Sequence, residues 1–178
     1  TNRLYLVGSD YALFASLLPH ERIYKCPADL SRWPLWTSVM TLAPELRSYA
    51  MNSYLGTTPA TLVSPLVLDS GYKIHLKSAQ ISADGPAERF VFMDVNPANI
   101  CTPGFGVDMS GRRWIHYPSD LHGQCAVIAF ADGHVEAHRW LDARTRVHLG
   151  TGAFIGHGTA VQNNADHAWI TAHTTGKK

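Results

Sequence analysis

Residues 121–140 read LHGQCAVIAFADGHVEAHRW, and this stretch decides the fold. An apolar run over 124–131 and an alternating run over 134–140 flank the dipeptide Asp132-Gly133. Asp-Gly between two such runs is a strong signal for a two-residue type I′ turn, in which both central residues have a positive φ. The stretch therefore predicts a β-hairpin that turns at Asp132-Gly133.

A two-residue turn would also set the register of this hairpin. Side chains alternate between the two faces of a strand, so apolar residues paired across the turn would share the buried face. These residues are Ile128, Phe130, Val135 and Ala137. The accessible face would carry His134, Glu136 and His138 beside Val127, Ala129 and Ala131. Imidazole and carboxylate groups in a row are candidates for ligand binding, and they are equally typical of a solvated strand face.

Other elements follow from periodicity and from turn residues. Ser9-Asp10 as an N-cap and Pro19 as a stop predict a short helix over 11–18. Strands are predicted over 47–55 and 89–95, a strand or a short helix over 72–81, and a helical turn over 164–171. Tight turns or loops are predicted over 26–29, 33–36 and 56–65. Together with the hairpin, these elements predict an α+β fold, with an antiparallel sheet packed on a helix at one side.

Residues 96–121 show no periodicity and are rich in Pro and Gly. A connection this long in a compact domain is usually functional or disordered. Asp94, which stands just before it, ends an apolar run and is interpreted as a turn residue. The loop ends at the hairpin, so we expect some of its polar and aromatic side chains to lie near the hairpin's polar face.

Five further stretches accompany the spacing of His122, nine residues, and Asp132-Gly133. They are YKCPAD (24–29), RSYAMN (47–52), FVFMD (90–94), PSDLHG (118–123) and NADHAW (164–169). In this order they resemble the H-X9-DG domain of bacterial pseudopilin-like proteins, over about residues 24–169. That family carries a prepilin-type N-terminal signal and is similar to type IV pilins and to the pseudopilins of type II secretion.

The resemblance implies a single pilin-like domain over 1–178, with an antiparallel β-sheet packed on an N-terminal helix and long irregular loops. Family members begin with a basic leader and a long apolar spine helix. Neither stands ahead of Thr1, so we expect a truncated or processed ectodomain. Its implied role is a structural or minor pseudopilin-like subunit of a secretion or pilus-type assembly, at the cell surface, in the periplasm or outside the cell. Its partners would be other pilin-like or secretion subunits.

Charge and hydropathy argue against two other classes of partner. The formal net charge is +1, which gives no electrostatic case for nucleic acid or for an anionic membrane surface. The longest apolar run, Cys125–Ala131, is far shorter than the ~20 residues of a membrane span. We therefore expect no nucleic-acid binding, and membrane contact only through the missing N-terminal helix.

The three cysteines have no C-x-x-C spacing, so no zinc ribbon is predicted. An extracellular setting would permit one disulfide, for which Cys26 with Cys101 is the predicted pair. Cys125, within the hairpin, is interpreted as a packed free thiol.

No cofactor is predicted in the main interpretation. Alternate strand residues are about 6.6–6.8 Å apart, so His134 and His138 are about twice that distance apart and cannot share one Zn²⁺ by themselves. A Zn²⁺ held by Glu136 and one of its hairpin neighbours, together with His116 or His122, remains an alternative, as does a Ca²⁺ held by loop oxygens. Asp132 is explained by its turn. It lies at the far end of the strand from His122, so these two signature residues are not expected to touch.

The alternative function is a secreted polysaccharide-active protein on the same scaffold, either a uronic-acid polysaccharide lyase acting by β-elimination or a carbohydrate-binding protein. A lyase needs a base, a cation that neutralises the substrate carboxylate, and an acid. The candidates are His116 or His122 as the base, Arg112 or Arg113 as the cation, and Tyr117 as the acid. Ligand contact would come from Trp114, His134, Glu136 and His138. The structural interpretation, which we favour, leaves the arginines solvated and packs Trp114 with Tyr117 under the loop. The main interpretation therefore assigns no catalytic residue and favours a protein without enzymatic activity, while a polysaccharide lyase stays open as the alternative.

Overall fold

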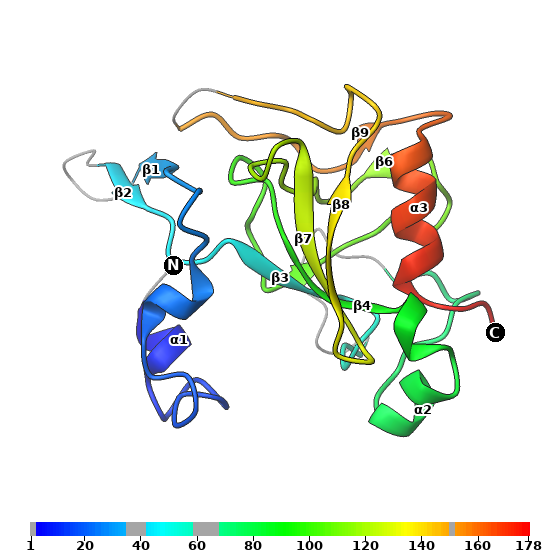
Figure 1. The fold of residues 1–178 in the computed structure, drawn as a ribbon, viewed down its shortest axis with the longest axis horizontal. Coiled ribbons are helices and arrows are strands. Elements are labelled where there is room, and N and C mark those ends of the chain that lie inside the picture. Colours follow the sequence, from blue (N-terminus) through cyan, green and yellow to red (C-terminus); the bar gives the residue numbers. More distant parts are fainter. Residues whose placement is uncertain (1–2, 35–41, 59–67, 150–151) are drawn as a thin grey trace.

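The fold is described by a computed structural model over residues 3–34, 42–58, 68–149 and 152–178 (Figure 1). It is a mixed α+β fold with one five-stranded sheet in the order β5-β3-β4-β7-β8. These strands are β3 Tyr49–Asn52, β4 Phe90–Asp94, β5 Gly104–Phe105, β7 Cys125–Phe130 and β8 Val135–Arg139. All neighbours pair antiparallel except β3 and β5, which are parallel. The predicted α+β class, the hairpin and both predicted strands are confirmed.

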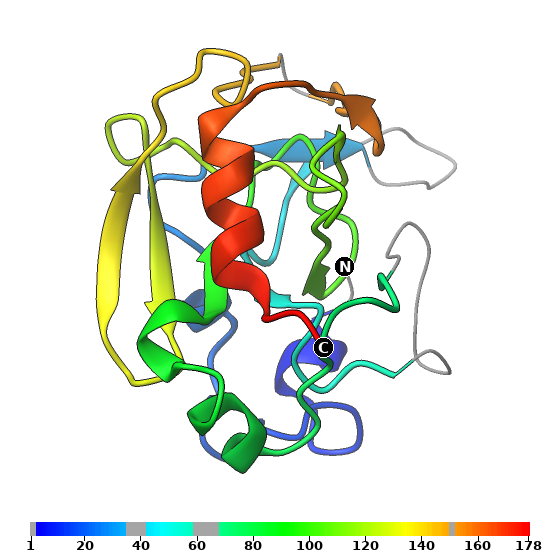
Figure 2. The ribbon, with the colours of Figure 1, turned by 90° about the vertical axis from the view of Figure 1, so that its right-hand side faces the viewer.

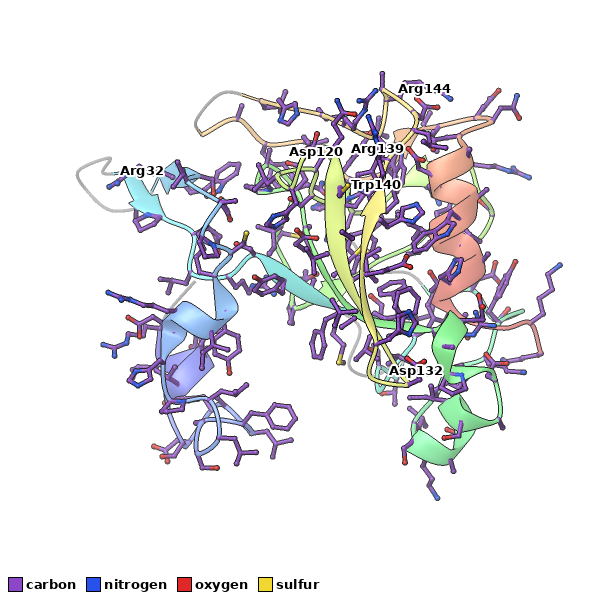
Figure 3. All side chains as sticks on the ribbon, viewed as in Figure 1. Arg32, Asp120, Asp132, Arg139, Trp140 and Arg144 are labelled. Atoms are coloured by element: carbon purple, nitrogen blue, oxygen red, sulfur yellow. The ribbon has the colours of Figure 1, made fainter. Side chains whose placement is uncertain are left out.

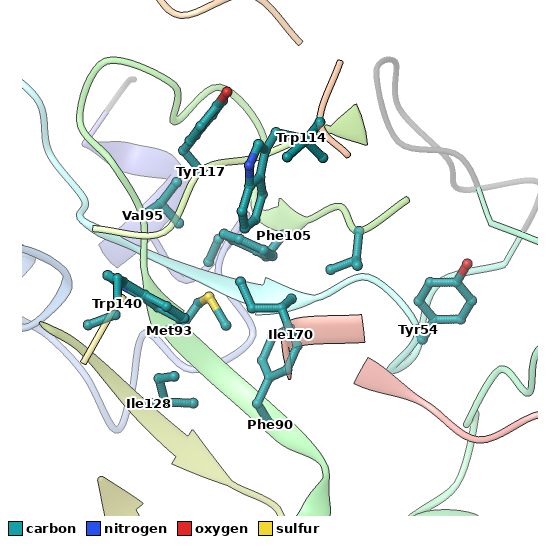
Figure 4. Close-up of a cluster of buried hydrophobic side chains, with 14 of the residues drawn as sticks. Tyr54, Phe90, Met93, Val95, Phe105, Trp114, Tyr117, Ile128, Trp140 and Ile170 are labelled. Carbon is teal, nitrogen blue, oxygen red and sulfur yellow. The ribbon is translucent and has the colours of Figure 1, made fainter. Parts of the chain in front are cut away.

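The core lies on one face of this sheet, where large apolar side chains gather (Figure 4). Phe90 and Met93 enter it from β4, and both are almost fully buried. Ala126, Ile128 and Phe130 alternate into it from β7. This alternation of buried and half-buried residues is the period-2 pattern of a strand with one buried face.

The helix that completes the core is α3, Ala165–Thr174, near the C-terminal end of the described chain. It begins at Asn164, whose side chain accepts a hydrogen bond from His167 N at 2.9 Å. Ile170 of α3 is fully buried, whereas α1 (Leu4–Val7) buries no residue. The predicted 164–171 helix is confirmed, but the expected N-terminal helix under the sheet is wrong. Figure 2 shows α3 running beside the hairpin, with the N-terminal segment behind.

The hairpin turns through three residues instead of two. Phe130 N donates to His134 O at 2.9 Å, and Gly133 N donates to Phe130 O at 3.1 Å. Gly133 has a φ of +97°, whereas Asp132 does not adopt a positive φ. A three-residue loop with glycine in the left-handed region is the next commonest hairpin connection. The predicted type I′ turn is therefore wrong by one residue.

That difference moves the side chains of β8 to the opposite face from the one predicted. Ala129 pairs with Val135 and Ile128 pairs with Glu136. Val135, predicted to be buried, is 62% exposed. Because the side-chain period of a strand is two, a slip of one residue exchanges its faces. His134, Glu136 and His138 therefore lie on the same side as Ile128 and Phe130.

The remaining elements are short. The two-stranded sheets are β1 Arg32–Pro34 with β2 Leu42–Pro44, and β6 Arg113–Trp114 with β9 Thr159–Ala160. Helical turns are η1 Glu21–Tyr24, α2 Ser78–Ser82 and η3 Pro86–Glu88. Over 72–81 the sequence predicted either a strand or a short helix. The structure has isolated β-bridges in this stretch, followed by the short helix α2. Of the predicted loops 33–36 and 56–65, only Trp33-Pro34 (in β1) and residues 56–58 lie within the described residues.

The predicted helix over 11–18 is wrong, because this stretch forms successive turns. Leu13 and Leu17 are 89% and 74% exposed, so the apolar residues that suggested a helix have no core to pack against. A helix this short has little stability in water without tertiary packing. The predicted turn at 26–29 is confirmed by a bond from Asp29 N to Cys26 O at 3.0 Å.

Candidate functional site

The long segment 96–121 is buried over much of its length, most continuously at 114–120. Trp114, His116 and Tyr117 are all almost inaccessible, and Trp114 stacks on Tyr117 with ring centroids 5.1 Å apart. Arg112 and Arg113 are exposed. The predicted packing of Trp114 with Tyr117 beneath solvated arginines is confirmed.

His122 lies in a different environment from these residues. Its Nε2 is 3.4 Å from Asp94 Oδ2 and 3.3 Å from Cys26 Sγ. Both neighbours face the same ring nitrogen, so His122 cannot pass a proton between them through its ring. The proposed bases His116 and His122 therefore sit in separate clusters, and the lyase candidates do not share one site. As expected, His122 and Asp132 stand at opposite ends of β7.

Asp94 is a buried acid and not the turn residue that was predicted. It is 1% exposed, and Oδ1 accepts a hydrogen bond from Val127 N at 2.7 Å. Oδ2 is buried 3.4 Å from His122 Nε2, but it makes no hydrogen bond among the described residues. Burial raises the pKa of this carboxyl to about 7. Asp94 joins β4 to β7 through its side chain, which a sequence pattern does not reveal.

The hairpin imidazoles pack against aromatic rings. His138 stacks on Trp169 of α3 at 3.7 Å between ring centroids, and Trp169 stacks on His173 at 4.0 Å. His134 stacks on Phe130 at 4.4 Å. Burial lowers the pKa of His138, which keeps the ring neutral and able to pack. These residues join the hairpin to α3 and do not form the open polar row that the sequence predicted.

Figure 3 shows how far apart the two ends of the hairpin are. Asp132 lies at one end, and Arg139 and Trp140 lie at the other, near Asp120. Glu136 contacts His138 Nδ1 at 3.5 Å, and neither His116 nor His122 joins it. The zinc site considered at Glu136 is therefore not formed among the described residues.

The sequence prediction missed a cluster of Cys101, His116 and His157. Cys101 Sγ is 3.5 Å from His116 Nε2 and 3.2 Å from His157 Nε2. It is the one group of metal-capable side chains found in the described part of the chain, with ligand atoms within 4.8 Å of one another. The sequence separations from Cys101 are 15 and 56 residues, so no local spacing marks the cluster.

All three cysteines are free, so the predicted disulfide between Cys26 and Cys101 is wrong. Cys26 is buried beside His122, whereas Cys101 is exposed beside His157. The expectation of a free thiol at Cys125 is confirmed.

The N-terminal segment lies on the other side of the sheet from α3 (Figure 1). Its large exposed apolar side chains form what we call the N-terminal face, made up of Leu4, Tyr5, Tyr11, Leu13, Phe14, Leu17 and Ile23. Between this segment and the sheet is a cavity of about 540 Å³. Phe14 and Ile23 line that space from the segment, and Met51 and Phe92 line it from β3 and β4.

None of the described helices is long and apolar enough to cross a membrane. No family model matches this chain, and no curated protein or solved structure is significantly similar to it.

Proposed function

We propose that this protein is a pilin-like structural or minor pseudopilin subunit of a secretion or pilus-type assembly, and that it contacts neighbouring subunits through the N-terminal face. The observation that carries the proposal is the number of large apolar side chains that this face leaves in water. Single exposed apolar residues are ordinary on protein surfaces, but their concentration in one short segment is typical of an interaction site.

The energy available at this face suits association between subunits. Leu13 is 89% exposed and Leu17 is 74% exposed. Complete burial of a leucine side chain contributes about 1.5–3 kcal/mol, so a few such residues can support a specific contact. The ion pair from Arg3 Nε to Glu21 Oε2 at 2.6 Å pairs opposite charges beside the face. Apolar contact, rather than net charge, would therefore drive the docking.

A second candidate function, polysaccharide binding, is favoured by a different cavity. It has a volume of about 300 Å³ and is lined by Trp33, Asp120 and His148 among others. The Trp33 indole N–H and the Ser31 hydroxyl are buried there without a hydrogen-bond partner among the described residues. His148 Nε2 lies 2.8 Å from Asp120 Oδ2. An indole ring with unused polar groups beside it is suited to a sugar ring and its hydroxyls.

Uronic-acid oligosaccharides added to the protein test this candidate by their effect on tryptophan fluorescence. Binding at the cavity should shift the emission of the wild-type protein, and Trp33→Phe should abolish the shift because the indole is removed. An unchanged shift in that variant would place any binding elsewhere. If the emission of the wild-type protein does not change as the oligosaccharides are added, polysaccharide binding at this cavity is excluded.

Sedimentation velocity over a dilution series tests the assembly proposal in solution. Leu17 and Leu141 are each 74% exposed, but Leu141 lies beyond the hairpin and outside the N-terminal face, so it provides a matched control. We expect the wild-type chain and Leu141→Asp to self-associate reversibly, and Leu17→Asp to remain monomeric. Equal association of both variants would show that the N-terminal face is not the contact.

A further inference from the structure

The cluster around Cys101 carries an inference beyond assembly. Cys101 is exposed, whereas His116 is 1% exposed and directs Nε2 at the sulfur. The two imidazole rings lie at 71° to each other with centroids 5.0 Å apart. Each ring thus presents the same type of nitrogen to one accessible sulfur, and the protonation of the rings decides what the cluster can do.

The backbone determines where His116 carries its proton. His116 Nδ1 lies 2.8 Å from Gly106 N, and a backbone N–H can only donate. Nδ1 therefore accepts, and the proton of the neutral ring is on Nε2, where it points at Cys101. Burial lowers the pKa of His116 to about 3, so the ring is neutral near pH 7.

The backbone gives His157 the opposite arrangement. Its Nδ1 lies 2.7 Å from Ile115 O, and a carbonyl oxygen can only accept. Nδ1 therefore carries the proton, and Nε2 has a free lone pair directed at Cys101. The amide nitrogen of Asn99 is also 3.4 Å from Nδ1, but it donates to Ile155 O at 2.8 Å. The shorter contact with Ile115 decides the tautomer.

Together these contacts allow one arrangement of protons. The Cys101 S–H donates to His157, and the sulfur accepts from His116. A metal would need an unprotonated nitrogen from each histidine, and a ligating histidine normally donates its other N–H to an acceptor. His157 meets both conditions, because its Nδ1–H donates to Ile115 O and its Nε2 is unprotonated. His116 meets neither, because its Nδ1 accepts from Gly106 N and its Nε2 carries the proton. The cluster therefore fits an activated thiol better than a metal site.

We propose that Cys101 is a nucleophilic thiol that undergoes exchange with disulfides, with His157 as its base and His116 as a hydrogen-bond donor to the thiolate. The thiol proton moves to His157 Nε2, and the sulfur attacks one sulfur of the disulfide. A new S–S bond forms, the old one breaks, and the second sulfur leaves as a thiolate. The disulfide is the only oxidant required.

The surroundings of Cys101 change the pKa of its thiol in opposite directions. Burial raises the pKa of the Cys101 thiol, and the Thr102 hydrogen bonds and the charge of Arg47 offset only part of that effect. The resting sulfur is therefore protonated, and transfer of its proton to His157 accompanies the attack. This is the role of a general base beside a nucleophile.

The test is site-resolved labelling of the whole chain with 5,5′-dithiobis(2-nitrobenzoate), read by mass spectrometry. Cys125 is half-buried, its Sγ lies 3.7 Å from Gly123 O, and it serves as an internal reference thiol. We expect Cys101 to react about tenfold faster than Cys125 or more, given the size of general-base effects. Equal rates would overturn the proposal.

His157→Gln should slow Cys101 by a similar factor and leave Cys125 unchanged, which also shows that the variant is folded. His134→Gln, at an exposed histidine paired with Asp132 at the hairpin turn, is the matched control and should change neither rate. An unchanged Cys101 rate in His157→Gln would overturn the role of His157 as base. A bound transition metal in the purified protein, with Cys101 unreactive until a chelator is added, would overturn the thiol proposal in favour of a metal site. None of these outcomes tests the assembly role that we propose for the N-terminal face.

Discussion

Asp94 carries a carboxyl group that is almost fully buried, and burial disfavours the charged form of a carboxyl group. It lies at the end of β4 with one carboxylate oxygen bonded to Val127 N and the other buried without a hydrogen-bond partner among the described residues. Its pKa is raised from 3.8 to about 7 by burial. Between these two values the unfolded chain binds fewer protons at this site than the folded chain, so this group makes the free energy of unfolding fall as pH rises.

Asp94→Asn should remove that contribution. Asparagine keeps an oxygen for Val127 N and has no charge to bury. The variant should therefore gain stability relative to wild type as pH rises from about 4 to 7, by up to about 4 kcal/mol, and the difference should level off on either side. Urea unfolding of both proteins across this range measures the difference. A difference that does not change with pH would contradict the raised pKa of Asp94.

At the scale of the element, the hairpin shows what a sequence pattern determines and what it does not. Both strands and the Asp-Gly turn were predictable, because their alternation and turn chemistry are local. Asp-Gly fits a two-residue or a three-residue loop, however, and only packing decides between them. Trp169 of α3 provides that packing by stacking on His138, which requires His138 to face the core side.

The same reasoning explains the other outcomes. The strands β3 and β4 were predictable from short apolar runs, and a helical turn was predicted over 164–171, where α3 forms. The cluster at Cys101 was not, because the fold brings together three segments that share no local spacing. The segment 11–18 does not form a helix. Its apolar residues predicted a buried helix face, but the fold leaves Leu13 and Leu17 exposed.

Two alanine substitutions test the observed register of the hairpin. Ile128 is fully buried, so Ile128→Ala should reduce the free energy of unfolding by about 2–5 kcal/mol. Val135 is 62% exposed, so Val135→Ala should reduce it by about 0.5 kcal/mol or less. Chemical denaturation measures both values. In the register predicted from the sequence the two residues would share the buried face, and comparable losses would support that register instead.

At the scale of the whole molecule, the sheet separates two different surfaces. On one side α3 closes the core with Ile170 and with the stack around Trp169. On the other side the N-terminal segment covers β3 and β4 with a cavity of about 540 Å³ between them, and it leaves Leu13 and Leu17 largely exposed. The molecule is thus closed by its own helix on one side, and the other side is where we propose that a neighbouring subunit binds.

Photo-crosslinking in the cells that naturally produce the protein tests whether the N-terminal face binds a neighbouring subunit. A photoreactive amino acid is placed at Leu17 in one strain and at Leu141 in another, two positions with the same 74% exposure. We expect the Leu17 probe to crosslink to another pilin-like chain, either a second copy of this protein or a related subunit identified by mass spectrometry, and the Leu141 probe not to do so. A Leu17 probe that captures no pilin-like chain, or no more than the Leu141 probe captures, would contradict the proposed role as an assembly subunit.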